Sequence, residues 1–337
     1  MLRSSPIEPG ERAPDFAAAR GQGDGDRVRF YGDAGGRTMA LVLAGGRPAD
    51  ILAAMVSELR EDLPPQVDMD VVAPHRASAE VTGGLHDVEG IVHGAYGVAP
   101  DGAGAVVVLD ANLRVVTVHP LEDLGPAVGA VEDTVRGRRQ HEHDDSIVRQ
   151  HAPVLLVRDA LSSSLCQRVM DAWQSGETTE SGVEANTDDG RREVGDIQRK
   201  RRRDLTITAP DLLTTLTDHV GRRVMPELTR AFAYQATRFE GFKVGCYDES
   251  GEGFFAPHRD NLSPATAHRR FALSLNLNDD YEGGELRFPE YGPQRYRPAP
   301  GEALVFSGSL LHEVLPVTRG RRFVLLSFLF NDADRRR

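Results

Sequence analysis

Cysteine is scarce in this chain of 337 residues, which has only Cys166 and Cys246. The two lie far apart, in no spacing typical of a metal site or a redox motif, so we expect two reduced thiols. No apolar run is long enough to cross a bilayer, and the amino terminus lacks the apolar segment of a signal peptide. These absences predict a soluble cytoplasmic protein without a membrane partner.

An excess of positive charge is also lacking. The formal net charge is −11 at pH 7, from 40 lysine and arginine residues against 51 aspartate and glutamate residues. Because contacts with phosphates need a basic face, the composition argues against a nucleic acid partner. With 40% hydrophobic residues, the chain is long enough for two domains with separate cores.

The amino-terminal part of the chain has the pattern of a mixed α/β domain. Residues 50–63 place Ile51, Met55, Leu59 and Leu63 on one helical face. Two valine-rich segments around a short turn predict a β-hairpin. The predicted strands span residues 38–43, 67–72, 105–110 and 113–118. The order is a βαβ unit, a hairpin and a closing helix.

Two motifs accompany this order: Gly10 with Ala13-Pro14-Asp15-Phe16 at the front, and Tyr96-Gly97-Val98 before a strand that ends in Asp110. Together they resemble the redoxins of the alkyl hydroperoxide reductase and peroxiredoxin type, which implies a thioredoxin-like fold for residues 1–137. The peroxidatic cysteine of that family is missing, because no cysteine precedes Cys166. Thiol catalysis by this domain is therefore excluded. A binding, scaffolding or dimerising role remains, the last giving a homodimer.

A polar, highly charged segment without periodic apolar residues follows and predicts a linker over residues 138–152. Its His141 and His143 are either metal ligands or, as we expect, solvated linker residues. A second domain is predicted over residues 153–333. It begins with a short strand and then a helix capped by the run Ser162-Ser163-Ser164.

Two further stretches of this domain precede the chemistry-bearing motifs. Residues 209–233 predict helical packing that Pro226 bends or breaks. Before them, residues 199–203 form a basic run, Arg-Lys-Arg-Arg-Arg, within an acidic protein. The run is either a rim that attracts an acidic substrate or a solvated strand edge that charge protects from aggregation, and we favour the strand edge.

Alternation of apolar and small or polar residues predicts the strands of the second domain. Over residues 271–278 the phenylalanine and leucines take one face, whereas Ala272, Ser274, Asn276 and Asn278 take the other. We expect the polar face to look into a cofactor cavity, which makes Ser274 and Asn276 candidate cofactor-binding residues. Short strands separated by glycine and proline predict an α+β domain built on a double-sheet jelly roll.

Two histidines and an aspartate have the pattern of a metal site. His258 and Asp260 are two residues apart, so on a strand both side chains leave the same face. His312 can supply the third ligand. Two histidines and one carboxylate make the facial triad that suits non-haem Fe(II) and leaves positions open. The alternative is a structural histidine or a silent relic.

Arg322 directly precedes the apolar run 323–328, which predicts a buried strand. An arginine at the start of a buried strand needs an anion as its partner. If 2-oxoglutarate chelates the metal through its keto and C1-carboxylate oxygens, its far carboxylate can bind a guanidinium bidentately. The alternative for Arg322 is an ordinary surface cation beside Arg319 and Arg321.

His258-x-Asp260, His312, Pro316-Val317-Thr318, Gly320 and Arg322 stand at the spacings of one known family. Residues from about 150 to 333 thus resemble the prolyl 4-hydroxylase type of 2-oxoglutarate/Fe(II)-dependent dioxygenase, whose fold is a double-stranded β-helix. Tyr247 stands where the family often has a tyrosine near 2-oxoglutarate, although it can also be plain core. Spacing favours Arg322 over Arg321 as the anion-binding residue.

The resemblance implies a dioxygenase with His258, Asp260, His312 and Arg322 as its catalytic set. It would use Fe(II), 2-oxoglutarate and O2, with ascorbate as reductant, and release succinate and CO2. The expected substrate is an aliphatic C–H of a proline or other amino-acid residue in a peptide, a protein or a small metabolite. The alternative is an iron- or oxygen-sensing module that binds a partner. A repair dioxygenase acting on nucleic acid would need the basic face that this chain lacks.

Overall fold

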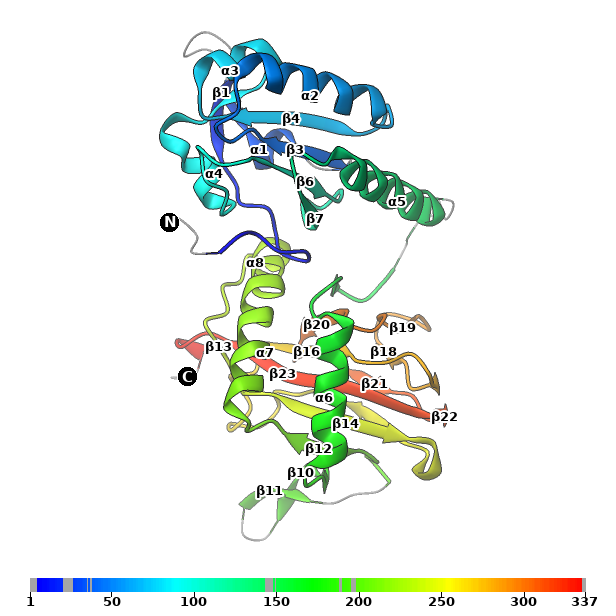
Figure 1. The fold of residues 1–337 in the computed structure, drawn as a ribbon. Coiled ribbons are helices and arrows are strands. Elements are labelled where there is room, and N and C mark those ends of the chain that lie inside the picture. Colours follow the sequence, from blue (N-terminus) through cyan, green and yellow to red (C-terminus); the bar gives the residue numbers. More distant parts are fainter. Residues whose placement is uncertain are drawn as a thin grey trace. The chain divides into compact units, whose positions relative to one another are not determined.

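The computed structural model describes residues 5–20, 27–34, 36, 38–142, 148, 150–187, 190–194 and 198–334. The chain divides into two compact units, Met1–Ser146 and Ile147–Arg337 (Figure 1). Each unit has its own hydrophobic cores. Within the described ranges, no helix is both long and apolar enough to cross a membrane.

The first unit is built on a seven-stranded mixed sheet in the order β2-β1-β5-β4-β3-β6-β7. Strands β3 and β4 are parallel, whereas β6 is antiparallel to both β3 and β7. The strands are β1 (Ala17–Arg20), β2 (Arg27–Arg29), β3 (Met39–Leu43), β4 (Asp68–Ala73), β5 (Leu85–His86), β6 (Ala105–Leu109) and β7 (Val115–Pro120). The helices are α1 (Phe30–Asp33), α2 (Ala49–Asp62), α3 (Arg76–Thr82), α4 (Ile91–Ala95) and α5 (Leu124–Glu142), with a 3-10 turn at Val88–Gly90. The predicted order of βαβ unit, hairpin and closing helix is confirmed.

The central strand β3 shows why this sheet is covered on both faces. Met39, Leu41 and Leu43 enter one core, while Ala40 and Val42 enter the other. Alternate side chains of a strand point to opposite faces, so a continuous apolar segment suits a strand buried on both sides.

The predicted face of helix α2 is wrong in part. Ile51 is 47% exposed, and the buried positions are Leu52, Val56 and Leu59. The helix has apolar residues over a wide arc, so periodicity alone could not fix which stripe faces the sheet. Packing against the neighbouring strands selects a stripe that is shifted by one position along the helix. Met55 contacts the same core, but its side chain is only partly buried.

The predicted linker begins too early, because α5 runs on to Glu142. Val131 and Val135 pack against Val108 and hold the preceding turns of the helix on the sheet. The arginines, glutamine and glutamate that follow are good helix formers, so the helix continues beyond its packed face. The side chain of His141 and all of His143 lie outside the described part of the chain, and the two interpretations of that pair stay predictions.

A buried polar pair fastens the loop that follows β3. Asp87 accepts the backbone N–H groups of Val92 and His93, and its carboxylate lies 2.6 Å from Nδ1 of His93. Burial alone would raise the pKa of the Asp87 carboxyl, but its hydrogen bonds with His93 and Val92 hold that pKa below the ordinary value. The backbone N–H of Gly45 donates to Nε2 of His93 at 3.1 Å. Both ring nitrogens of His93 therefore have protein partners, and one of them binds the backbone just after β3.

The second unit has two facing sheets, as predicted for a double-sheet jelly roll. The larger has the order β8-β20-β16-β23-β14-β12-β9, with β13 also paired to β23, and the smaller has the order β15-β21-β18-β19. The larger sheet contains β8 (Val154–Val157), β9 (Thr179–Glu180), β12 (Arg203–Thr206), β13 (Arg238–Phe239), β14 (Lys243–Asp248), β16 (Phe271–Asn276), β20 (Ala303–Ser307) and β23 (Arg321–Phe330). The smaller contains β15 (Phe255–His258), β18 (Leu286–Arg287), β19 (Arg295–Tyr296) and β21 (His312–Val314). Short pairs join β17 (Glu282–Gly283) to β22 (Val317–Arg319) and β10 (Val183–Thr187) to β11 (Gly190–Val194), and a 3-10 turn spans Glu249–Gly251.

Helices cover one face of the larger sheet, and the smaller sheet covers the other (Figure 1). The helices are α6 (Ser163–Ser175), α7 (Pro210–Arg223) and α8 (Met225–Phe232). The serine run caps α6 as predicted, and the structure identifies Ser162 as the residue whose hydroxyl does so. The predicted break falls between α7 and α8, just before Pro226. The alternation of β16 is confirmed, because Leu273 packs against the helices while Ala272 lies in the core between the sheets.

Both cysteines of this unit are free and buried. Burial raises the pKa of the Cys166 thiol to about 11. Burial, with the nearby Asp248, raises the pKa of Cys246 to about 12. Both side chains are therefore protonated thiols at neutral pH and act as small apolar core residues.

Candidate metal centre and co-substrate cavity

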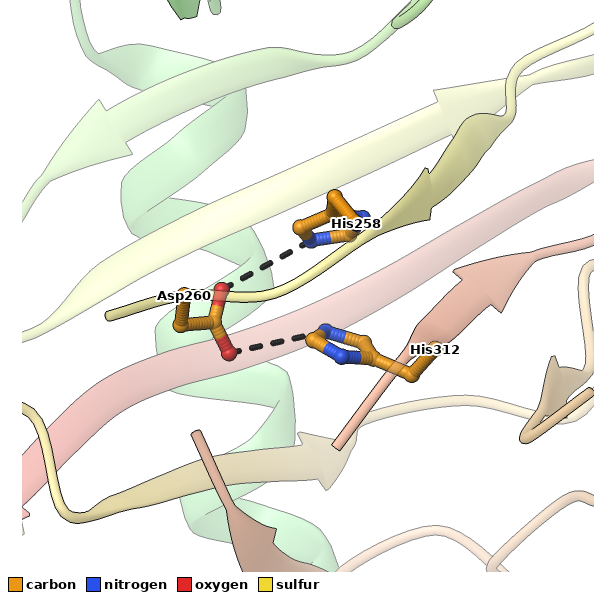
Figure 2. Close-up of side chains that lie close together, drawn as sticks. All are labelled: His258, Asp260 and His312. Atoms are coloured by element: carbon orange, nitrogen blue, oxygen red, sulfur yellow. Dashed lines mark ion pairs between the residues drawn. The ribbon is translucent and has the colours of Figure 1, made fainter. Parts of the chain in front are cut away.

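Two neighbouring strands of the smaller sheet bring the predicted metal ligands together. His258 ends β15 and lies directly opposite His312, which begins β21. Asp260 follows β15 and points between the two imidazole rings (Figure 2). Its Oδ1 is 3.6 Å from Nε2 of His258, and its Oδ2 is 3.5 Å from Nε2 of His312. One ligand atom from each residue lies within 4.8 Å of the others.

Backbone carbonyls fix which nitrogen of each ring faces this cluster. Nδ1 of His258 is 2.8 Å from the carbonyl oxygen of Ala256, and Nδ1 of His312 is 2.9 Å from that of Leu310. A carbonyl only accepts, so each Nδ1 carries the proton and donates it. Each Nε2 then keeps its lone pair, which is the form that a metal ion binds.

The electrostatics of the His258, Asp260 and His312 cluster favour a bound cation. Burial lowers the pKa of His312 to about 4 in spite of the neighbouring Asp260 carboxylate, so the ring is neutral at pH 7. Oδ2 of Asp260 is buried and has no hydrogen-bond partner among the described residues. A carboxylate oxygen facing a nitrogen lone pair in a buried site is unfavourable. A metal ion between them removes that penalty, and two imidazoles with one carboxylate fit Fe(II).

Arg322 lies on the larger sheet and is only 2% exposed. Its Nε donates to Oδ1 of Asn276 at 3.3 Å, and its guanidinium lies 5.5 Å from the ring centroid of Tyr247. Among the described residues it forms no ion pair with a carboxylate. A buried guanidinium without a counter-charge is costly, so the position suits an anionic ligand.

The two adjacent arginines differ sharply in their surroundings. Arg321 has a side chain that is 57% exposed and pairs with Asp248 at 3.0 Å. Arg322 is buried and lines the same cavity as the histidine and aspartate cluster. Arg321 is therefore the surface cation, which agrees with the preference that spacing gave to Arg322.

Tyr247, Ser274 and Asn276 take different places around Arg322. Tyr247, on β14, is opposite Arg322, and its ring centroid lies 5.5 Å from the Arg322 guanidinium and 5.6 Å from that of Arg202. Ser274 lines the cavity. Asn276 does not: its amide binds two backbone carbonyls, the Tyr281 hydroxyl and Arg322. It therefore orients Arg322 instead of facing a ligand directly.

The cavity has a volume of about 410 Å³ and opens onto the metal ligands, Tyr247, Ser274 and Arg322. Seven lysine and arginine residues line it against two carboxylates. The cations are Arg199, Lys200, Arg202, Lys243, Arg259, Arg269 and Arg322, and the carboxylates are Glu240 and Asp260. Asp204 and Glu290 pair with Arg202 and Arg259 from outside this lining, so seven cations face four carboxylates and the excess is positive in a protein whose net charge is −11.

The interpretation of the basic run as a solvated strand edge is wrong for two of its residues. Arg199 accepts the N–H of Ala256, and Arg201 donates its N–H to Phe254, so the run pairs with the chain that leads into β15. Alternation along this pairing turns Lys200 and Arg202 into the cavity. Strand alternation within the run was the available signal, but the segment lacks the apolar residues that reveal which face is inside.

Arg202 is held on the inner face of the sheet by Asp204. Its Nε and Nη2 donate to the carboxylate at 2.6 and 2.7 Å, and its Nη1 donates to the Tyr247 hydroxyl at 3.2 Å. Gly245 makes room for this arrangement, since a Cβ there would come within 2.8 Å of Cδ of Arg202. Burial would raise the pKa of Asp204, but the Arg202 guanidinium holds it below the ordinary value.

Replacing Asp204 with asparagine should therefore destabilise the second unit at pH 7 by about 2–3 kcal/mol, because Arg202 loses its counter-charge. The lowered pKa of Asp204 means that its contribution is present above the ordinary aspartate pKa and is lost as the pH falls through the folded value. Urea unfolding at pH 7 and at a series of pH values well below 3.8 would check this, because the difference should shrink as the pH falls. An equal difference between wild type and variant at every pH would contradict the ion-pair argument.

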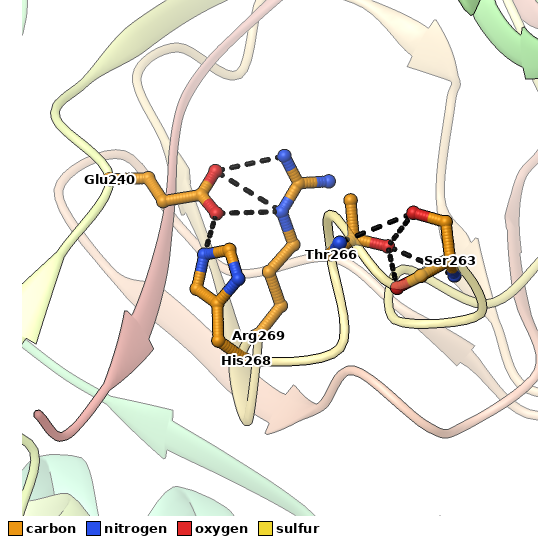
Figure 3. Close-up of polar contacts among 5 residues, drawn as sticks. All are labelled: Glu240, Ser263, Thr266, His268 and Arg269. Carbon is orange, nitrogen blue, oxygen red and sulfur yellow. Dashed lines mark hydrogen bonds and ion pairs between the residues drawn. The ribbon is translucent and has the colours of Figure 1, made fainter. Parts of the chain in front are cut away.

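The loop between β15 and β16 is fastened at the cavity by contacts that sequence analysis missed (Figure 3). Glu240 accepts hydrogen bonds from Arg269, at 2.9 and 3.1 Å from Nε and at 2.8 Å from Nη2, and lies 2.5 Å from Nε2 of His268. The Ser263 and Thr266 hydroxyls bond each other at 2.7 Å and close a turn within the loop. Sequence periodicity cannot predict such contacts, because they join an irregular loop to a turn that is distant in the sequence.

A two-sheet fold that holds a buried histidine, aspartate and histidine cluster beside a buried arginine defines the class of non-haem iron oxygenases. The sequence model of the 2OG-Fe(II) oxygenase superfamily matches residues 242–330. A PKHD-type hydroxylase from Xylella fastidiosa is 30% identical over 171 residues, which cover 46% of this chain and 72% of that relative. The chain therefore belongs to the 2OG-Fe(II) oxygenase superfamily, with hydroxylases of the PKHD type among its relatives.

Further similarities cover other shares of the chain. A PKHD-type hydroxylase from Xanthomonas campestris pv. campestris is 32% identical over 120 residues, or 34% of this chain and 50% of that relative. Among solved structures, a prolyl hydroxylase from Trichoplax adhaerens, in complex with a hypoxia inducible factor peptide fragment, is 19% identical with a TM-score of 0.45. That similarity covers 60% of this chain and 96% of the other.

Proposed function

We propose that this protein is an Fe(II)- and 2-oxoglutarate-dependent dioxygenase that hydroxylates an aliphatic C–H and releases succinate and CO2. The substrate is a proline or other amino-acid residue in a peptide, a protein or a small amino-acid-derived metabolite. One observation carries the proposal: the cavity that exposes the His258, Asp260 and His312 cluster also exposes Arg322, a buried cation without a carboxylate partner among the described residues.

Each residue has a role that follows from its contacts. His258 and His312 present neutral Nε2 lone pairs, and Asp260 presents the negative charge that offsets part of the metal charge. Arg322 binds the far carboxylate of 2-oxoglutarate, with Asn276 fixing the angle of its guanidinium. The Tyr247 hydroxyl, which accepts from Arg202, can donate its own proton to the bound co-substrate. Bound Fe(II), with 2-oxoglutarate, supplies the O2 activation that hydroxylation needs, and ascorbate is the proposed reductant.

Anaerobic titration with Fe(II) and 2-oxoglutarate tests this function directly. We expect the weak visible charge-transfer band of a bidentate chelate, and its decay with succinate release when oxygen is admitted. A folded protein that binds iron but releases no succinate would favour the alternative, an iron- or oxygen-sensing module that binds a partner. Absence of the band would contradict the proposed co-substrate site.

For the first unit we propose a thioredoxin-like fold that recruits a partner or forms a homodimer. Its order of elements supports this, and the lack of any cysteine before Cys166 removes thiol chemistry. The proposed domains are residues 1–137 and 153–333. The linker between them is shorter than predicted, because α5 continues beyond residue 137 to Glu142. Light scattering of the full chain and of residues 147–337 separates the two roles. If the full chain is a monomer, as the fragment is, dimerisation through the first unit is ruled out.

A further inference from the structure

We infer that Glu290 is a positioning residue of the metal centre. Its carboxylate joins the segment that holds His258 and Asp260 to the segment that leads into His312. The inference rests on the proposed function and assigns a further residue to the same site. Glu290 lies in the turn between β18 and β19, so it belongs to neither of the strands that carry the ligands, and it does not line the cavity.

The backbone pairing between the two ligand strands is short and irregular. β21 has three residues, and its register with β15 consists of Phe255 opposite Val314 and His258 opposite His312 (Figure 2). Between these two pairs, β15 has one residue more than β21, and one of its residues is Pro257, which has no backbone N–H to donate. An extra residue disrupts the ladder and bends the strand. Backbone pairing alone therefore fixes the separation of the two histidines only weakly.

The two carboxylate oxygens of Glu290 bind on either side of this weak point. Oε1 accepts from Nη2 of Arg259, the residue between the first two ligands, at 2.6 Å. Oε2 accepts from the backbone N–H of Leu311, which directly precedes His312, at 3.3 Å. The contact with Arg259 is a short, charge-assisted hydrogen bond, the stronger kind in proteins. A single planar group thus spans the two ligand segments.

Arg259 extends this contact into a network. Its Nη1 donates to the carbonyl oxygen of Ser309, and the backbone N–H of Asp260 donates to that of Gly308 at 2.9 Å. The side chains of Arg259 and Glu290 are 31% and 43% exposed, and an isolated ion pair at such a position would contribute little. Here the pair acts together with the neighbouring bonds. Those bonds fix residues 308 and 309, and Glu290 extends the attachment to the residue next to the ligand.

The test is a titration of the metal-free full chain with Co(II), followed through the visible d–d bands of the bound ion. Glu290→Ala removes both contacts, and we expect its Co(II) affinity to fall by at least about tenfold, the lower end of the range for outer partners of metal ligands. Glu290→Gln should lose less, because the amide oxygen can still accept one of the two hydrogen bonds. The Tm without metal should stay close to that of wild type in both variants, because the side chain is partly exposed.

Glu282→Ala is the matched control. Glu282 pairs with Arg319 at 2.8 Å across the separate two-stranded sheet of β17 and β22, and its side chain is 58% exposed. The change removes the same charge and should leave the Co(II) affinity within about twofold of wild type, as for a surface ion pair. The inference is overturned if Glu290→Ala binds Co(II) as tightly as Glu282→Ala does. Equal losses in Glu290→Ala and Glu290→Gln would also overturn it, since charge and not the contact would then be responsible.

Failure of the proposed function gives a different result. Folded wild-type protein that binds no Co(II) would refute the proposed metal centre and, with it, the role of Glu290. Wild-type protein that binds Co(II), with an affinity that neither change at Glu290 lowers, would refute only the positioning role. If Glu290→Ala fails to fold, the comparison of Glu290→Gln with Glu282→Gln decides. A loss confined to Glu290→Gln would support the inference, and equal affinities would refute it.

Discussion

Asp260→Ala should abolish iron-dependent succinate formation. Asp260 supplies the only carboxylate of the cluster among the described residues, and its loss leaves two neutral imidazoles for a divalent cation. Removing a supporting partner of a metal ligand already costs about 10–100-fold in metal affinity, so removing a ligand should cost more. The variant should therefore show a loss of more than about 100-fold in Fe(II) affinity, measured by anaerobic equilibrium dialysis, and no chelate band.

Stability measurements separate this effect from misfolding. Without metal, the variant should unfold no earlier than wild type, because the change removes a buried carboxylate oxygen that has no hydrogen-bond partner. Only the rise in Tm on adding metal should vanish. Asp171→Ala is the control, since Asp171 lies on the exposed face of α6 and contacts Gln167. Wild-type succinate release by Asp260→Ala would refute the ligand assignment.

Arg322→Ala should weaken 2-oxoglutarate binding by about 2–5 kcal/mol, the range for truncating one partner of a buried charge pair. This corresponds to roughly 30-fold to several-thousand-fold in Kd. Fe(II) affinity should stay close to that of wild type, because Arg322 lies on the other sheet and contacts Asn276 and Tyr247, not the metal ligands. Titration of the chelate band with 2-oxoglutarate at saturating Fe(II) measures the change.

The neighbouring arginine provides the control for this experiment. Arg321→Ala removes the same charge from an exposed side chain paired with Asp248, so it should leave 2-oxoglutarate affinity within about twofold of wild type, as for a surface ion pair. Equal losses in both variants would mean that general electrostatic attraction, and not a specific contact, binds the co-substrate. Equal weakening of iron and 2-oxoglutarate by Arg322→Ala would place the carboxylate contact elsewhere.

Part of the candidate metal centre was predictable from sequence because His258 and Asp260 obey a local rule. The spacing of His258 and Asp260 places both side chains on one face of a strand. The strand that holds Arg322 is recognisable from the apolar run that follows this residue. The partner strand of His258 could not be derived in this way. The direct pairing with His312 depends on how distant strands meet, and for that the family resemblance supplied what spacing alone did not.

The features that escaped prediction depend on packing between segments. Lys200 and Arg202 face inward because the basic run pairs with residues 254–256 at the start of β15, a contact that charge alone does not reveal. Ile51 is exposed because the sheet selects among several apolar stripes of α2. The contact of Glu240 with Arg269 joins two irregular segments, whose sequences have no hydrophobic periodicity from which the contact could be predicted.

The carbonyl contacts of the His258 and His312 imidazoles have an entropic consequence for the proposed binding of a metal ion. Each ring is anchored to a carbonyl oxygen two residues earlier in the chain, so its rotation is already restricted in the folded protein. Freezing a free side chain on binding would cost about 0.5–1.5 kcal/mol. Here that ordering occurs during folding, and the two histidines can receive a metal ion without rearranging. Affinity for metal is thus set by charge and geometry, with little loss of side-chain freedom.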